Sequence, residues 1–100
     1  MGLDFAIDAL YDTGWVNAEG GAAEQHSDGR AYPSPEAVKA IFAEQGFDLT
    51  IRHIQLFDCY RAEWRDSTGQ AAGAVVGQSA AEATVYALSQ LRKQIVAVQA

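Results

Sequence analysis

Three arginines in the second half of the chain are the residues whose type and spacing point most directly to chemistry. Arg61 and Arg65 fall on the same face of a segment that alternates in polarity, and Arg52 belongs to the strand predicted before it. Guanidinium groups on an uncovered sheet face would bind anions or RNA. The alternative, which we favour, is a solvated face where Glu63 and Asp58 supply cross-strand pairs.

Two further groups have the residue types of nucleophilic catalysis. His26, Ser27 and Asp28 are adjacent, but a hydrolase needs its base held against the nucleophile by rigid elements, and these residues are typical of a polar turn. His53 and Cys59 lie on successive predicted strands without a third group to orient them. A lone cysteine on a strand is typically a small, half-buried hydrophobe. We therefore expect no catalytic residues and no enzyme activity.

The ligand spacings of metal and cofactor sites are missing from the sequence. Its two histidines and one cysteine have neither a Cys-x-x-Cys nor a His-x-x-x-His spacing. No calcium loop is present, and Gly73 and Gly77 are not followed by the lysine of a phosphate-binding loop. The sequence thus predicts neither a metal nor a cofactor.

Composition and charge indicate a globular, acidic protein. The chain has 100 residues, of which 49% are hydrophobic, and a formal net charge of −6. Nine acidic and two basic groups lie in residues 1–48, whereas residues 49–100 carry four acidic and five basic groups. An acidic chain is repelled by phosphate polymers at long range, which disfavours nucleic acid as a partner. With no signal peptide or membrane-spanning run, and a single cysteine, we expect a cytoplasmic protein without a membrane partner.

Hydrophobic periodicity predicts three helices. Residues 3–12 have apolar positions on one face, and residues 35–45 follow Ser34 as an N-cap. The last helix begins with a capping box made by Ser79 and Glu82. Its apolar stripe consists of Ala83, Ala87, Leu88, Leu91 and Ile95. A helix of about ten residues is marginal alone in water, so the first must dock on the rest of the protein.

Three segments have the pattern of strands, namely 49–57, 59–65 and 71–77. In the second, one face carries Tyr60, Ala62 and Trp64, and the other carries Cys59, Arg61, Glu63 and Arg65. The alternation of the first strand slips at Ile54, Leu56 and Phe57, which indicates a bulge or the start of a turn. Short connections between the strands predict antiparallel pairing.

The stretch from residue 16 to 31 has no periodicity and is rich in glycine, alanine and polar residues. A segment of this kind is either functional or mobile, and we favour mobile. The aromatic residues Tyr11, Trp15 and Tyr32 flank it. They would either pin the first helix to the core, which we favour, or form an apolar patch for a partner.

These elements predict a single α+β domain. A three-stranded antiparallel sheet has two helices packed on one face, in the order α-β-β-β-α, and a short N-terminal helix is added. We expect an N-terminal helix within residues 1–15, a flexible loop over 16–32 and the core over 33–98. The side chains that should share the apolar side of the sheet are Val38, Ile41, Phe42, Leu88, Leu91 and Ile95.

Residues 34–97 resemble the double-stranded RNA-binding domain in their element order. The scaffold part of that family's motif is matched by Gly77, Ser79, Glu82 and Ala83. The resemblance implies that fold, but the three phosphate-contacting lysines of the family would fall at Ala80, Ala81 and Thr84. The same junction is also similar to that of HicB-type antitoxin domains. The resemblance supports a fold and argues against carrying over RNA binding.

Three kinds of function remain to be distinguished. The first is a non-catalytic module for protein interaction or oligomerisation, whose partner is another protein or a second copy. The second is an RNA-binding protein that uses Arg52, Arg61 and Arg65 on a sheet face. The third, an enzyme, has almost no support in the sequence, and we favour the first.

Overall fold

The structure is a computed structural model that describes residues 2–15 and 23–99, with residues 23 and 95–99 described by their backbone alone. Its elements are α1 (Gly2–Asp12), β1 (Ala23–Gln25), β2 (Ala31–Pro33), α2 (Pro35–Glu44), β3 (Asp48–Ile54), β4 (Cys59–Arg65), β5 (Ala71–Gly77) and α3 (Ala80–Gln99).

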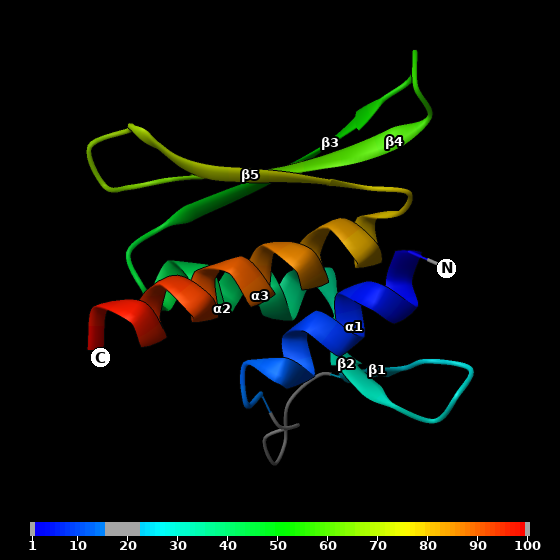
Figure 1. Ribbon diagram of the computed structural model, residues 1–100. Coiled ribbons are helices and arrows are strands. Elements are labelled where there is room, and N and C mark those ends of the chain that lie inside the picture. Colours follow the sequence, from blue (N-terminus) through cyan, green and yellow to red (C-terminus); the bar gives the residue numbers. More distant parts are fainter. Residues whose placement is uncertain (1, 16–22, 100) are drawn as a thin grey trace.

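The elements form layers (Figure 1). The antiparallel sheet β3-β4-β5 is one layer, and α2 and α3 cover one of its faces. On the side of these helices away from the sheet lie α1 and the two-stranded β1-β2 sheet. The predicted α+β class is confirmed, including the three-stranded sheet with helices packed against it.

The pleat of β4 divides the sheet into two chemically different faces. On the helix side, Trp64 pairs with Leu49 of β3, and Ala62 pairs with Ile51. Ala62, Trp64 and Leu49 are buried, which confirms the predicted core face of β4. Val38, Phe42, Leu88 and Leu91 are buried against this face and Ile41 is half-buried, whereas the side chain of Ile95 lies outside the described part.

Trp64 is the largest side chain of this core, and its position depends on a glycine. Its ring lies 5.3 Å from the ring of Phe42. Gly73 is its partner on β5, and a Cβ atom at Gly73 would come within 2.3 Å of the Trp64 ring. The absence of a side chain at Gly73 therefore provides the space that the indole fills.

Burial of α3 extends around more of the helix than its predicted apolar stripe. Val85, Thr84 and Ser89 are also fully buried. The hydroxyl groups of Thr84 and Ser89 donate to carbonyls of the same helix, Ala80 at 2.9 Å and Tyr86 at 2.7 Å, so their burial leaves no free donor. The reason for the wider burial is that α3 packs between the sheet and α1. No helix among the described residues is both long and apolar enough to cross a membrane.

The helices α1 and α3 run in the same direction. The carboxylate of Glu82 lies against Gly2 at the start of α1. At the other end, Arg92 donates from Nε to the Thr13 hydroxyl at 2.7 Å. The apolar face of α1, formed by Ala6, Ile7 and Leu10, belongs to the core. The first helix thus docks on the rest of the protein, as its length required.

The stretch between residues 16 and 31 differs from its prediction where it is described. Residues 23–25 pair with 31–33 as an antiparallel hairpin, while residues 16–22 lie outside the described part. The hairpin is held to α1 by the Tyr11 hydroxyl, which donates to the Ala31 carbonyl at 2.6 Å, and by an ion pair between Arg30 and Asp8. These long-range contacts have no periodic signature in the sequence.

Tyr11, Trp15 and Tyr32 take mainly the structural role that we favoured. Trp15 and Tyr32 are partly buried and pack against the core. The Tyr11 ring lies 5.6 Å from that of Trp15, and its hydroxyl holds the hairpin.

The strand predicted over 49–57 ends earlier, at Ile54. Residues 55–58 form a tight turn, closed by the N–H groups of Phe57 and Asp58, which donate to Ile54 and Gln55. Asp58 has a φ angle of 48°, in the left-handed region that ends such turns. The slip in alternation is therefore the turn itself, one of the two outcomes expected.

We predict that Gly73→Ala lowers the free energy of unfolding by about 1–3 kcal/mol, because the added methyl group displaces the Trp64 ring. In a Trp64→Phe background the smaller ring leaves room, so the same substitution should cost less by at least about 1 kcal/mol. Urea unfolding of the four proteins in this double-mutant cycle measures the difference. The control is Ala74→Val on the solvent side of β5, expected within about 0.5 kcal/mol of wild type. Equal costs in both backgrounds would contradict this account.

Candidate interaction face of the sheet

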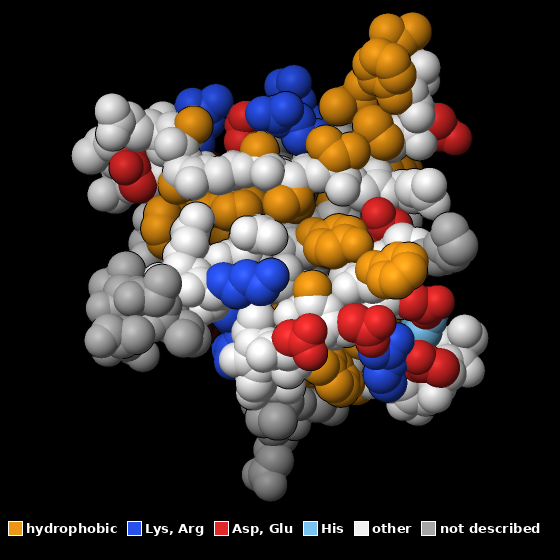
Figure 2. All heavy atoms as spheres, in the orientation of Figure 1, with side chains coloured by type: hydrophobic (Ala, Val, Ile, Leu, Met, Phe, Trp, Pro, Cys, Tyr) orange, Lys and Arg blue, Asp and Glu red, His pale blue; other side chains and the backbone are white. Residues whose placement is uncertain are grey.

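The face of the sheet turned away from α2 and α3, here called the open face, is not covered by any described element. The register assigns to it Asp48, Thr50, Arg52 and Ile54 from β3, Cys59, Arg61, Glu63 and Arg65 from β4, and Ala74 and Val76 from β5. In Figure 2 basic side chains project from the sheet on this side with an acidic group among them, and a further cluster of acidic groups lies at the opposite end of the molecule.

The three arginines singled out from the sequence are brought together on the open face. Arg52 is the direct cross-strand partner of Arg61, and Arg65 follows Arg61 on the same side of β4. Directly opposed residues have Cβ atoms about 5 Å apart, and like charges in this position destabilise a sheet. The predicted shared face is confirmed, and the register adds a like-charge pair that the sequence did not reveal.

One carboxylate serves two of these arginines. Glu63 accepts from Arg61 at 3.2 Å and from Arg65 at 3.3 Å. The hydrogen bond from Arg61 is the largest cause that holds the pKa of Glu63 below its usual 4.5. The pairing expected with Glu63 is present, but Asp58 bonds to His53 at 3.2 Å. Within the described part of the chain, no acidic group lies within ion-pair distance of Arg52.

Next to the open face, the turn between β3 and β4 carries two large apolar side chains in water. Leu56 is 84% exposed and Phe57 is 73% exposed. Figure 2 shows hydrophobic side chains projecting at this end of the hairpin. Turns are usually built from Gly, Asn, Asp and Ser, so the side chains of Leu56 and Phe57 are not of the types that favour a turn. Leu56 and Phe57 were not among the candidate site residues expected from the sequence, although apolar residues at a break in alternation were the available signal.

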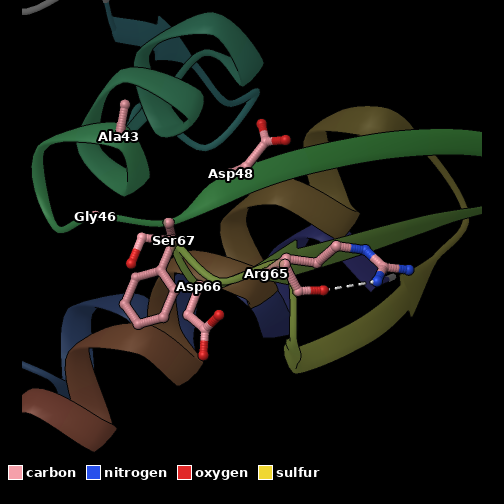
Figure 3. A pocket seen from close by; sticks show the side chains of 8 residues that line it. Ala43, Gly46, Asp48, Arg65, Asp66 and Ser67 are labelled. Carbon is pink, nitrogen blue, oxygen red and sulfur yellow. Dashed lines mark hydrogen bonds between the residues drawn. The ribbon is translucent and has the colours of Figure 1, made fainter.

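At the opposite end of the sheet lies a shallow, open hollow between the turn after α2 and the β4–β5 turn. Figure 3 shows Arg65 extending along the hairpin, where it donates to the Gly69 carbonyl at 3.1 Å. Asp66 bonds within its own turn, chiefly to the Thr68 hydroxyl, which lowers the pKa of Asp66. With Asp48 and Asp66 at its rim, the hollow suits neither an anion nor an enclosed apolar ligand.

The register separates the thiol and imidazole considered for catalysis. His53 pairs with Tyr60 and Cys59 pairs with Ile54, so neighbouring positions place His53 and Cys59 on opposite faces of the sheet. The His53 ring packs at 4.7 Å from that of Tyr60. The two side chains therefore do not form a nucleophile–base pair.

His26 and Asp28 lie where the β1–β2 turn meets α1. The His26 imidazole bonds to Asp4, and Arg30 bridges Asp8 and Asp28. Ligand atoms of Asp4, His26 and Asp28 lie within 4.8 Å of one another, so within residues 2–15 and 23–99 these three could hold a cation. Because Arg30 already holds Asp28 at 2.7 Å, we interpret the group as an ionic tie between hairpin and helix.

Comparison of the chain with protein-family models, curated proteins and solved structures finds no match in any of the three. The resemblances to the double-stranded RNA-binding domain and to HicB-type domains remain predictions. The phosphate-contacting lysines of the double-stranded RNA-binding domain would fall at Ala80, Ala81 and Thr84. Of these positions, Thr84 is fully buried and could not contact a phosphate.

The shared carboxylate gives a testable titration. We expect the carboxyl group of Glu63 to titrate below 4.5, and Arg61→Gln to raise its pKa more than Arg65→Gln does, because the Arg61 hydrogen bond is the larger cause. A depressed folded-state pKa stabilises the protein above pH 4.5, and this contribution is lost as the pH falls through the lower value. Side-chain NMR titration of wild type and both variants measures the order, and a larger effect of Arg65→Gln would refute it.

Proposed function

We propose that this protein is a non-catalytic interaction module that binds an acidic, partly apolar segment of another protein on its open face. The observation that carries the proposal is the direct opposition of Arg52 and Arg61 on an uncovered sheet surface. A like-charge pair in register lowers the stability of the sheet. A carboxylate lying between the two guanidinium groups would turn this repulsion into affinity.

The charge distribution supports an acidic partner. The open face of β3 and β4 carries three arginines and two carboxylates: Asp48, which lies opposite Arg65, and Glu63, which bonds to Arg61 and Arg65. The rest of the chain is acidic, since the net charge is −6. The acidic remainder of the chain would repel a long polyanion along its whole length. A short acidic segment would contact mainly the basic surface. The proposal therefore names a protein segment as the ligand.

Apolar groups beside the arginines support a mixed ligand. Val76 of β5 is 53% exposed and pairs with Arg61, and Ile54 lies at the same end of the open face. Leu56 and Phe57 extend this apolar surface beyond the strands. Exposed aromatic and aliphatic side chains of this kind commonly anchor protein interfaces. The cytoplasm remains the compartment we propose, which the free thiol of Cys59 supports.

RNA binding through the same arginines is the second candidate. Its support is the basic face, which could contact phosphates. Against it stands the acidic remainder of the chain. The open-face positions of β3, β4 and β5 also include no aromatic side chain for stacking bases, and Phe57 lies beyond them in the turn. The experiment on the proposed ligand separates the two.

We predict that a short peptide alternating glutamate with valine binds the wild-type protein and that Arg52→Gln with Arg61→Gln abolishes most of this affinity. Each lost charge-assisted hydrogen bond should weaken binding about tenfold. Isothermal titration calorimetry at about 50 mM salt measures the affinity for the peptide. Duplex RNA is tested under the same conditions, because phosphate contacts are strongest at low salt.

The matched control removes the same charge elsewhere. Lys39→Gln with Lys93→Gln, on exposed positions of α2 and α3, changes the net charge equally and should leave peptide binding within about twofold. If both double variants lost the same affinity for the peptide, the loss would be explained by the change in net charge and not by the open face. Binding of RNA without peptide would replace the proposal by the second candidate, and binding of neither would end both.

The apolar turn gives a separate prediction. Leu56→Ser with Phe57→Ser should weaken binding of the glutamate–valine peptide roughly tenfold, because burial of one such side chain in the interface contributes about 1.5–3 kcal/mol. Thermal stability should be unchanged, since both side chains are already in water. A peptide with threonine in place of valine serves as control, and it should bind the variant and wild type equally. An undiminished affinity for the valine peptide would exclude the turn from the interface.

A further inference from the structure

The edge of the sheet formed by β5 has backbone groups without a partner strand. The strand order places β5 at one edge and β3 at the other. In the described part of the chain, the only backbone pairing of residues 71–77 is with β4. Figure 1 shows β5 on the near side of the sheet, and no helix crosses this edge. An edge of this kind is a template for a further strand.

Apart from one bulge, this edge lacks the usual devices that prevent pairing. Charged residues and proline protect most natural edges, but β5 has the sequence AAGAVVG. Its single irregularity is a bulge at Ala72, which leaves residues 73–77 in regular register. The other edge is different, because β3 carries Asp48 and Arg52. Of the two edges of the β3-β4-β5 sheet, β5 is thus the one suited to edge-to-edge pairing.

Apolar side chains lie below the β5 edge. Figure 2 shows hydrophobic groups gathered under β5, over α3 and α1. Because α1 and α3 run in parallel, with Gly2 beside Glu82, the residues one turn further along lie level with each other. These are Phe5, which is 59% exposed, and the half-buried Tyr86. The β5 edge itself carries no charge, whereas below it burial and the neighbouring Glu82 carboxylate raise the pKa of the Tyr86 hydroxyl.

We propose that two copies of this chain associate by antiparallel pairing of their β5 strands about a twofold axis, with Phe5 and Tyr86 packing beneath the joined sheets. The contact uses the backbone edge of β5 and not the arginines of the open face, so the inference does not depend on the proposed ligand. Because such a contact is small, it forms a reversible dimer of the kind that buries less than about 1,200 Å².

A second copy fits this edge better than a foreign strand does. In strand addition, main-chain hydrogen bonds give affinity and side-chain pockets give specificity. The alanines and glycines of β5 form no such pockets, but they match their own small side chains. No charge on β5 opposes the symmetric contact. The arginines of the two β4 strands would be three strand spacings apart, about 14 Å, beyond the screening length of about 8 Å at physiological salt.

A pair of variants tests the inference at matched positions. Glu63 has Ala74 of β5 on one side and Thr50 of β3 on the other, and all three lie on the open face. Ala74→Lys introduces an edge charge that would face its symmetry mate, whereas Thr50→Lys introduces the same charge on the far edge. We expect wild type and Thr50→Lys to dimerise with rising concentration in sedimentation equilibrium, and the dissociation constant of Ala74→Lys to rise at least tenfold.

Hydrogen exchange of the wild-type protein locates the contact without a substitution. The amides of residues 71–77 should gain protection between dilute and concentrated samples, while those of residues 48–54 should not. Melting temperatures of both lysine variants check that the fold is intact. A wild-type protein that stays monomeric at submillimolar concentration, or a dimer broken by Thr50→Lys and not by Ala74→Lys, would overturn the proposal.

Discussion

The alternation of side chains along β4 is the constraint on which the rest of the molecule depends. The same seven residues direct Ala62 and Trp64 into the core and Arg61, Glu63 and Arg65 into solvent. A shift of the strand by one residue would bury arginines and expose the tryptophan, so the register is strongly specified. The core that holds the helices and the surface proposed to bind a partner are therefore two sides of one strand.

The helix layer follows from the core side of β4. Trp64 fills the space left by Gly73 and contacts Phe42, which fixes α2 against the sheet. The third helix then packs on the same face and is covered in turn by α1. A helix buried on two sides needs its polar groups satisfied internally, which explains the hydroxyl-to-carbonyl bonds of Thr84 and Ser89. Stability of the whole protein thus rests on contacts that leave the opposite sheet face unused.

That unused face and the neighbouring edge differ in their chemistry. The open face combines like charges with apolar side chains, a combination that lowers stability in isolation and suits an acidic ligand. The β5 edge is neutral and small, which suits backbone pairing with an identical strand. Joining two copies along β5 would place two open faces on one continuous sheet. A dimer could then bind two acidic segments at once, which raises the overall affinity for a partner that carries both.

The sequence by itself determined the local elements. The periodicity of residues 35–45, 59–65 and 80 onward predicted α2, β4 and α3, because a regular helix or strand repeats its buried positions at a fixed spacing. The alternation of β4 also indicated that Arg61 and Arg65 share a face. Tertiary structure decided what no spacing encodes: the opposition of Arg52 and Arg61, the burial of Thr84 and the β1–β2 hairpin. Each of these depends on how segments distant in the sequence align, and periodicity within one segment carries no information about its neighbour's register or about what packs over it.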